Sequence, residues 1–288
     1  MSKKAARPIS TAKRPYTLPA RPEALLSMVE LMQRKEPNAD QIAQILKQDV
    51  CLYASVLSEV NAPHLGLRKK ITDLTHAITL LGLDRLFAIV RLAALKNSLG
   101  KVERLDRFWD SATEIAELSA LLAKKLTDLD PHDAYSLGMM HDCGIPVMLE
   151  AFSDYKAFLR TGNGNKPLEI KRIEQQQFSA NHFTIGGEMA DKWYMPHEIS
   201  QAIELQVDLI DVLSGKVECN DKTKTLICVL TLAKEVSAIY RRFWRIYDNK
   251  EPLMELPLVL AYLGLPDVDY LDLREDLLKE LEKKDMIS

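Results

Sequence analysis

The sequence predicts an all-α protein, and three observations support this. Apolar residues recur at helical spacing through nearly all of the chain after Pro22. No segment alternates apolar and polar residues over a useful length, as a half-buried strand would, and no internal repeat is found. The 288 residues suffice for one large domain or two small ones with an ample apolar core.

The first helices follow a basic N-terminal segment. Residues 1–16 carry several lysines and arginines, no acidic residue and few side chains large enough to be buried, which predicts a disordered tail rather than a nucleic-acid-binding arm. Leu25, Met28, Val29 and Met32 form an apolar stripe of helical period. Either residue of the pair 72–73 can cap a later helix that ends at Gly82.

A second set of helices begins near Arg107. The pattern predicts helices over 108–126, from Pro131 toward His141, and over 168–176, 179–193, 197–214 and 223–247. The glycine- and asparagine-rich stretch 161–167 predicts a flexible loop. Three prolines then interrupt the chain before an acid-rich helix around 269–284.

Charge and hydropathy narrow the class of protein. A net charge of −3 and a pI of about 6.1 give no general reason to expect a nucleic acid or an acidic membrane as partner. No apolar run approaches the roughly 18 to 20 residues that a membrane span needs, and the N-terminus lacks the apolar core of a secretory signal. The four cysteines form no C-x-x-C pair, which is typical of thiols in a reducing compartment. We therefore expect a cytoplasmic protein without a membrane partner.

The most informative motif is the adjacent pair His141–Asp142. An apolar helical run leads into the pair, and Gly144 and Pro146 follow it. The two side chains together offer a metal ion one nitrogen and one carboxylate oxygen. Such a pair supports hydrolysis only if other parts of the chain supply the remaining ligands.

A series of short motifs occurs along the chain in a defined order. It comprises Leu18–Pro22, Asp49, Asn61, Gly66, Ile71, Ala77–Gly82, Phe108–Trp109, Gly138–Gly144, Glu174 and His182–Pro196. In this order and spacing the motifs resemble the HDOD domain, a bacterial relative of the HD metal-dependent phosphohydrolases. The resemblance implies a signalling role and an N-terminal helical half, residues 17–98, packed on an HD-like helical half, residues 99–248. Residues 249–288 would then form a C-terminal extension.

The resemblance also implies a set of metal ligands, and this chain carries only part of it. The family positions retained are His141, Asp142 and His182. The remaining family positions hold residues unsuited to a divalent cation, namely Ser111, Gln206, Val207 and Lys234. We therefore expect a degenerate site, assign no catalytic residue, and expect any Fe, Mn, Ni or Zn to bind at low occupancy.

Lys234 is the most consequential of these departures. Its ammonium would repel a divalent cation in a partly desolvated site, and it could instead take the vacated position and pair with Asp142. A one-residue shift of register near Gln206 would bring in Asp208, so an altered metal site stays open as an alternative. We favour a structural role for the His141–Asp142 pair over metal binding, and a core role for His182, because ligands are missing.

The segment 240–247 interleaves arginines with aromatic residues. Arg241, Arg242, Trp244 and Arg245 could stack on bases and hold phosphates, or they could complement the dipole at a helix C-terminus. We favour the second interpretation because the rest of the chain is acidic. The same residues could also form a surface for a protein partner.

These observations together predict a non-catalytic, HDOD-like regulatory protein. We expect it to bind a signalling protein in trans, or a small-molecule ligand, through the pocket around His141 and Asp142. The alternative is a metal-dependent phosphohydrolase, acting on a phosphodiester or a nucleotide, with an altered ligand set. A nucleic-acid partner is not expected.

Overall fold

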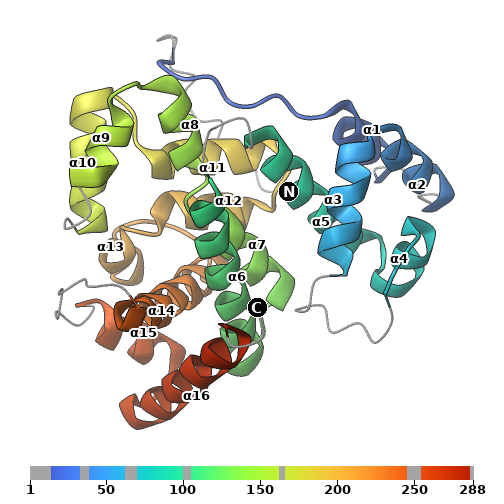
Figure 1. Cartoon of the computed structure of the whole chain (residues 1–288). Helices are drawn as coiled ribbons and strands as arrows, with labels where there is room; N and C mark the ends of the chain where they lie inside the picture. Colours follow the sequence, from blue (N-terminus) through green and yellow to red (C-terminus); the bar gives the residue numbers. More distant parts are fainter. Residues whose placement is uncertain are drawn as a thin grey trace.

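The structure is a computed structural model that describes residues 14–32, 39–61, 70–99, 105–161, 166–244 and 254–285. These residues form helices joined by turns, with no strand among them, so the predicted all-α fold is confirmed. Figure 1 shows a smaller group of helices, α1 to α5, beside a larger group that begins with α6.

The N-terminal group packs around α5. Its helices are α1 (Glu23–Met32), α2 (Ala39–Gln48), α3 (Val50–Val60), α4 (Leu74–Leu81) and α5 (Leu83–Leu99). Helix α1 buries Leu25, Met28 and Leu31, which shifts its inner face slightly from the predicted stripe. Asp73 caps α4 by accepting hydrogen bonds from the backbone N–H groups of the next turn. Gly82 follows the last residue of α4, and its φ of +79° favours glycine.

Three pairs of helices form the most extensive contacts of the larger group. Its elements are α6 (Asp106–Leu126), α7 (Pro131–Met140), α8 (Gly144–Ala151), α9 (Tyr155–Thr161), α10 (Pro167–Phe178), α11 (His182–Lys192), α12 (His197–Leu205), α13 (Leu209–Leu213) and α14 (Asp221–Trp244). Helix α6 lies against α7 and α14, and α11 lies against α12. These contacts surround the turn between α7 and α8, where the candidate site lies.

The single helix predicted over 197–214 is wrong, because the chain turns between α12 and α13. The side-chain amide of Gln206 donates to the carbonyl oxygens of Ile203 and His141, at 3.0 and 2.6 Å. Asp208, two residues later, forms an ion pair with Lys171 of α10. Contacts with distant helices therefore fix this turn, although the apolar period continues on both sides of it.

A pair of arginines joins the N-terminal group to the larger one. Arg91 of α5 donates to the backbone oxygen of Tyr194, in the turn between α11 and α12. Arg21 donates to the backbone oxygen of Lys192 at 3.0 Å and lies over the Tyr194 ring, 4.8 Å from its centre. Both guanidinium groups thus contact the same turn of the larger group, the one between α11 and α12.

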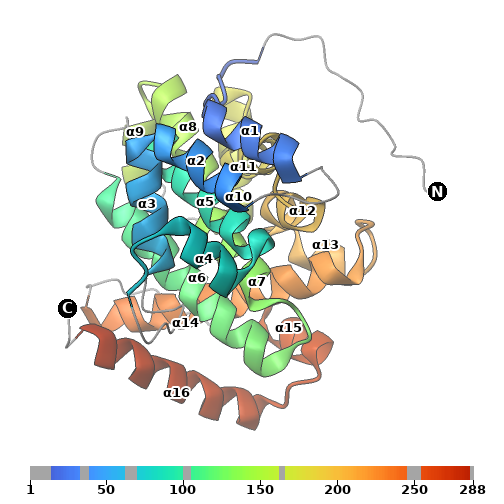
Figure 2. The ribbon, with the colours of Figure 1, turned by 90° about the vertical axis from the view of Figure 1, so that its right-hand side faces the viewer.

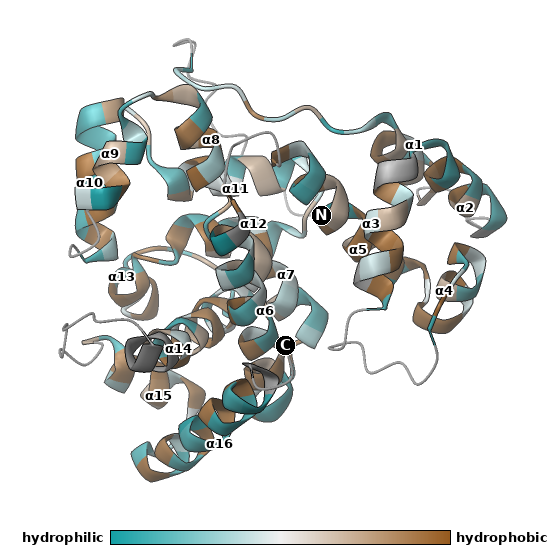
Figure 3. Cartoon of the chain, viewed as in Figure 1, coloured by the Kyte–Doolittle hydropathy of each residue, from teal (hydrophilic) through white to brown (hydrophobic). Residues whose placement is uncertain are grey.

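The C-terminal helices α15 (Leu256–Leu263) and α16 (Asp267–Asp285) pack on α14. They lie at one end of the molecule in both ribbon views (Figure 2). Along α16, Figure 3 shows hydrophobic residues between hydrophilic ones, and the buried ones include Tyr270, Leu277 and Leu281. The Tyr270 hydroxyl donates to Glu235 of α14. Among the described residues, no helix combines the length and hydropathy that crossing a lipid bilayer requires.

Candidate functional site

The turn that carries His141 and Asp142 is held by two close backbone contacts. A Cβ added at Gly138, on α7, would lie 2.5 Å from the Cα of Ala116 on α6. A Cβ added at Gly144, the first residue of α8, would lie 2.0 Å from the carbonyl oxygen of His182 on α11. Glycine at these positions therefore lets α7 approach α6 and lets the start of α8 approach the start of α11.

The carboxylate of Asp142 is the centre of the site. His141 places its Nε2 atom 3.1 Å from Oδ2. His182 and Lys234 both approach the other oxygen, Oδ1, each at 3.9 Å through Nε2 and Nζ. The structure thus brings four of the predicted site residues together, from the α7–α8 turn, α11 and α14.

Each imidazole is oriented by a bond to its other nitrogen. Nδ1 of His141 lies 2.6 Å from the carbonyl oxygen of Gly138, and Nδ1 of His182 lies 2.8 Å from both carboxylate oxygens of Glu174. Because carbonyl and carboxylate oxygens only accept, the Nδ1 atoms are the donors. The Nε2 atoms of both rings are thereby directed toward Asp142, the arrangement by which carboxylates and carbonyls orient histidines around a metal.

Charge holds Asp142 in its ionised form. Burial favours the neutral carboxyl, but the electrostatic effects of His141 and Lys234 and the hydrogen bond with His141 outweigh it, so the pKa of Asp142 lies far below its usual range. The side chain of Asp142 is 27% exposed, so the carboxylate borders solvent on one side.

Gln206 fixes the position of Lys234. The ammonium donates to the side-chain oxygen of Gln206 at 2.7 Å, and the amide nitrogen of Gln206 donates to the backbone oxygen of His141. Gln206 is buried, whereas Lys234 is 34% exposed. The lysine is therefore tied to the same turn that carries Asp142.

The remaining predicted residues lie on α6, in the turn after α12 and at the end of α14. Ser111 is half-buried on α6, and Val207 is half-buried in the turn after α12. Asp208 pairs with Lys171, so the register shift that would make it a ligand is not what the structure shows. Arg241, Arg242 and Trp244 lie in the last turns of α14, and Arg245 lies outside the described residues.

Sequence reasoning missed the partner of His182. Glu174, fully buried on α10, accepts hydrogen bonds from the Tyr155 hydroxyl at 2.6 Å and from the backbone N–H of His182 at 2.9 Å. Burial, with the nearby Glu174 charge and hydrogen bond, raises the pKa of Tyr155 above its usual range. Glu174 belongs to the motif series, but its contact with Tyr155 has no spacing signature because it joins α9 to α10.

As they stand, these side chains do not suit a divalent cation. Lys234 carries a positive charge against the oxygen that faces His182. Within the ranges that the structure describes, no group of three His, Cys, Asp or Glu side chains has a geometry that could hold a metal ion. The two imidazoles and the carboxylate are present, but an ammonium lies beside them.

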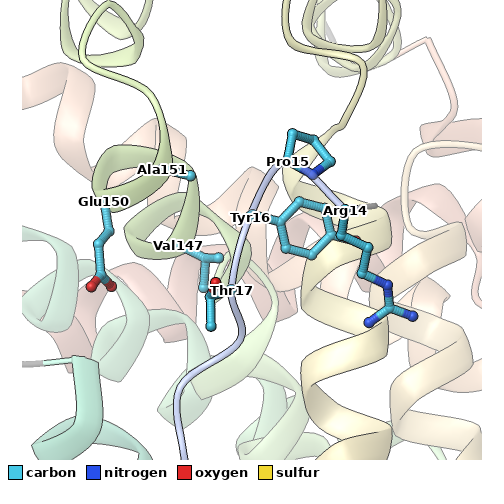
Figure 4. A pocket seen from close by; sticks show the side chains of 7 residues that line it. All are labelled: Arg14, Pro15, Tyr16, Thr17, Val147, Glu150 and Ala151. Carbon is cyan, nitrogen blue, oxygen red and sulfur yellow. The ribbon is translucent and has the colours of Figure 1, made fainter. Parts of the chain in front are cut away.

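A separate pocket of about 210 Å³ lies beside the N-terminal segment (Figure 4). It is lined by Arg14, Pro15, Tyr16, Thr17, Val147, Glu150 and Ala151. The Tyr16 hydroxyl donates to Glu188 of α11 at 2.8 Å, and Arg14 lies 3.2 Å from the same carboxylate oxygen. Of the predicted basic tail, residues 1–13 lie outside the described residues, and residues 14–16 contact the larger group of helices.

The chain belongs to the HDOD domain family, whose family model matches residues 18–209. The match begins within the segment before α1, covers the N-terminal group and helices α6 to α12 of the larger group, and ends at the start of α13. Helices α14 to α16, including Lys234, therefore lie beyond the matched part.

Individual relatives are distant in sequence. An uncharacterized protein of Treponema pallidum (strain Nichols) is 22% identical over 202 residues, which are 69% of this chain and 39% of that protein. The chain thus spans well under half the length of this curated relative.

Solved structures share the fold. One, named "Putative phosphohydrolase", from Shewanella amazonensis SB2B, has a TM-score of 0.66 at 21% identity, covering 91% of this chain and 90% of that one. An HDOD domain protein with unknown function from Geobacter sulfurreducens has a TM-score of 0.63 at 20% identity, covering 94% and 90%. A "Putative signal transduction protein" from Marinobacter aquaeolei VT8 has a TM-score of 0.63 at 18% identity, covering 91% and 57%.

Proposed function

We propose that this protein is a regulatory HDOD domain that does not hydrolyse phosphoesters. In this proposal it binds a signalling protein or a small-molecule ligand through the site around Asp142. The name of the Marinobacter aquaeolei protein, which shares the fold, points in the same direction.

One observation carries the proposal. The Asp142 carboxylate is already engaged by His141, His182 and Lys234, all from the chain itself. A metal-dependent phosphohydrolase needs a cation that polarises a phosphoryl oxygen and lowers the pKa of a bound water. The ammonium of Lys234 can supply a positive charge, but it has no open coordination position for a water and a substrate oxygen.

The test is a phosphodiesterase assay with added metals. Purified protein is incubated with bis(p-nitrophenyl) phosphate and, in turn, Mn²⁺, Fe²⁺, Ni²⁺ and Zn²⁺, beside the Asp142→Ala variant. We expect no difference in turnover between the two proteins under any of these conditions. Metal-dependent turnover by the wild type that disappears in Asp142→Ala would favour the phosphohydrolase alternative.

A binding measurement complements the assay. Thermal unfolding of the wild type and of Asp142→Asn is followed with a panel of nucleotides, because a ligand that binds the folded state raises the melting temperature. A ligand of this site should raise the melting temperature of the wild type more than that of Asp142→Asn. Equal shifts in both proteins would place the binding elsewhere.

A further inference from the structure

We infer that the ammonium of Lys234 is the resident cation of this site and takes the place that a divalent metal ion would need beside Asp142. This inference rests on the proposed function, because a metal-loaded enzyme would have no place for the lysine. It goes further because it assigns the exclusion of a divalent ion to a single side chain.

The groups around Asp142 have the composition of a metal site. Two imidazole nitrogens and one carboxylate form a ligand set that Zn²⁺ and other first-row divalent ions bind. The Nδ1 atoms of His141 and His182 are occupied by Gly138 and Glu174, which leaves both Nε2 atoms facing the carboxylate. None of these orienting contacts involves Lys234.

The position of Lys234 explains why a divalent ion is excluded from Asp142. Its Nζ atom and Nε2 of His182 approach the same oxygen of Asp142 at the same distance, 3.9 Å. A cation bound between His182 and Asp142 would therefore lie beside the ammonium, and like charges at such a distance repel strongly. Lysine and a divalent ion exclude each other from this carboxylate.

The lysine is held in place by more than its attraction to Asp142. Gln206 accepts a hydrogen bond from it and is itself bonded to the backbone of His141 and Ile203. Because the amide of Gln206 is buried and bonded on both sides, it keeps the ammonium aimed at the carboxylate. Gln206 is therefore the residue that positions the ammonium of Lys234.

The test is a titration with Co²⁺, whose visible absorption reports coordination by nitrogen and oxygen ligands, and with Zn²⁺ by calorimetry. The proteins are the wild type, Lys234→Ala, and the double variant Lys234→Ala with Asp142→Asn. Lys216→Ala is the matched control, because Lys216 also pairs with an aspartate, Asp211 at 3.0 Å, but on the exposed surface. Lys234→Met serves if the alanine variant does not fold, as judged by circular dichroism.

We expect Lys234→Ala to bind one equivalent of metal at least tenfold more tightly than the wild type and the Lys216→Ala control. The gain should disappear in the double variant. The same metals should raise the melting temperature of Lys234→Ala and leave that of the wild type unchanged.

The outcomes separate this inference from the proposed function. If neither the wild type nor the Lys234 variants bind metal, the inference is wrong and the proposed function stands. If the wild type binds one equivalent as tightly as Lys234→Ala, Lys234 is not the resident cation. Metal-dependent turnover by that wild type would also overturn the proposed function.

Discussion

At the scale of single residues, the site depends on side chains outside the His141–Asp142 pair. Glu174 has no exposed surface and accepts hydrogen bonds from Tyr155, from the backbone of His182 and from the His182 ring. Its carboxylate therefore decides which nitrogen of His182 faces Asp142. A buried acceptor with three donors is sensitive to any change in its hydrogen-bonding capacity.

We expect Glu174→Gln to lower the free energy of unfolding by about 2 kcal/mol, because the amide replaces one acceptor oxygen by a donor and loses the charge. Tyr155→Phe removes one donor and leaves the other contacts, so its loss should be about 1 kcal/mol. Urea denaturation measures both, and the double variant reports their coupling. Equal, additive losses would show that the two side chains act independently.

At the scale of elements, the position of α8 is set by one glycine. Gly144 begins α8, and its backbone lies directly against the carbonyl of His182 at the start of α11. This contact brings the His141–Asp142 turn to the helix that carries His182. The burial of Cys143 between them, and the charge of Asp142, raise the pKa of its thiol above its usual range, so it is a core side chain and no nucleophile.

We expect Gly144→Ala to destabilise the protein by about 1 to 3 kcal/mol, because the new methyl group cannot fit and α8 must shift. Helix propensity alone predicts the opposite, a gain of up to about 1 kcal/mol for alanine inside a helix. The sign of the change in the urea midpoint therefore decides between the two. A more stable variant would mean that α8 and α11 do not approach as described.

At the scale of the whole molecule, the two groups of helices meet through charged side chains as well as through apolar ones. Arg91 donates to the backbone of Tyr194 and lies 4.7 Å from the centre of the Phe87 ring. Burial lowers its pKa to about 10, so it stays charged at neutral pH. The charged guanidinium of Arg91 therefore links α5 to the turn between α11 and α12 through a hydrogen bond.

We expect Arg91→Ala to lower the free energy of unfolding by about 1 to 3 kcal/mol, since both the hydrogen bond and the packing of the long side chain are lost. Arg85→Ala, an exposed position on the same helix, is the control and should change stability by less than about 0.5 kcal/mol. Thermal or urea unfolding gives the comparison. Similar effects of the two substitutions would show that the Arg91 contact is not stabilising.

The fold and the centre of the site could be predicted from the sequence, but the connections between elements could not. Helical period, the cap at Asp73 and the break at Gly82 are local signals, and the motif order indicates that His141, Asp142 and His182 converge. The turn at Gln206 has no local signal, because its contacts reach His141 and Lys171 on other helices. Such contacts between distant segments leave no spacing that a single sequence reveals.

The lysine beside Asp142 also has a consequence for how the site can change by mutation. Either lysine codon becomes a glutamate codon by a change of its first base, which would replace the ammonium with a carboxylate at the same place. Because the orienting contacts of His141 and His182 do not involve Lys234, they would persist through that change. A single-base change at this codon would therefore reverse the charge beside Asp142 and leave the orientation of both imidazoles as it is.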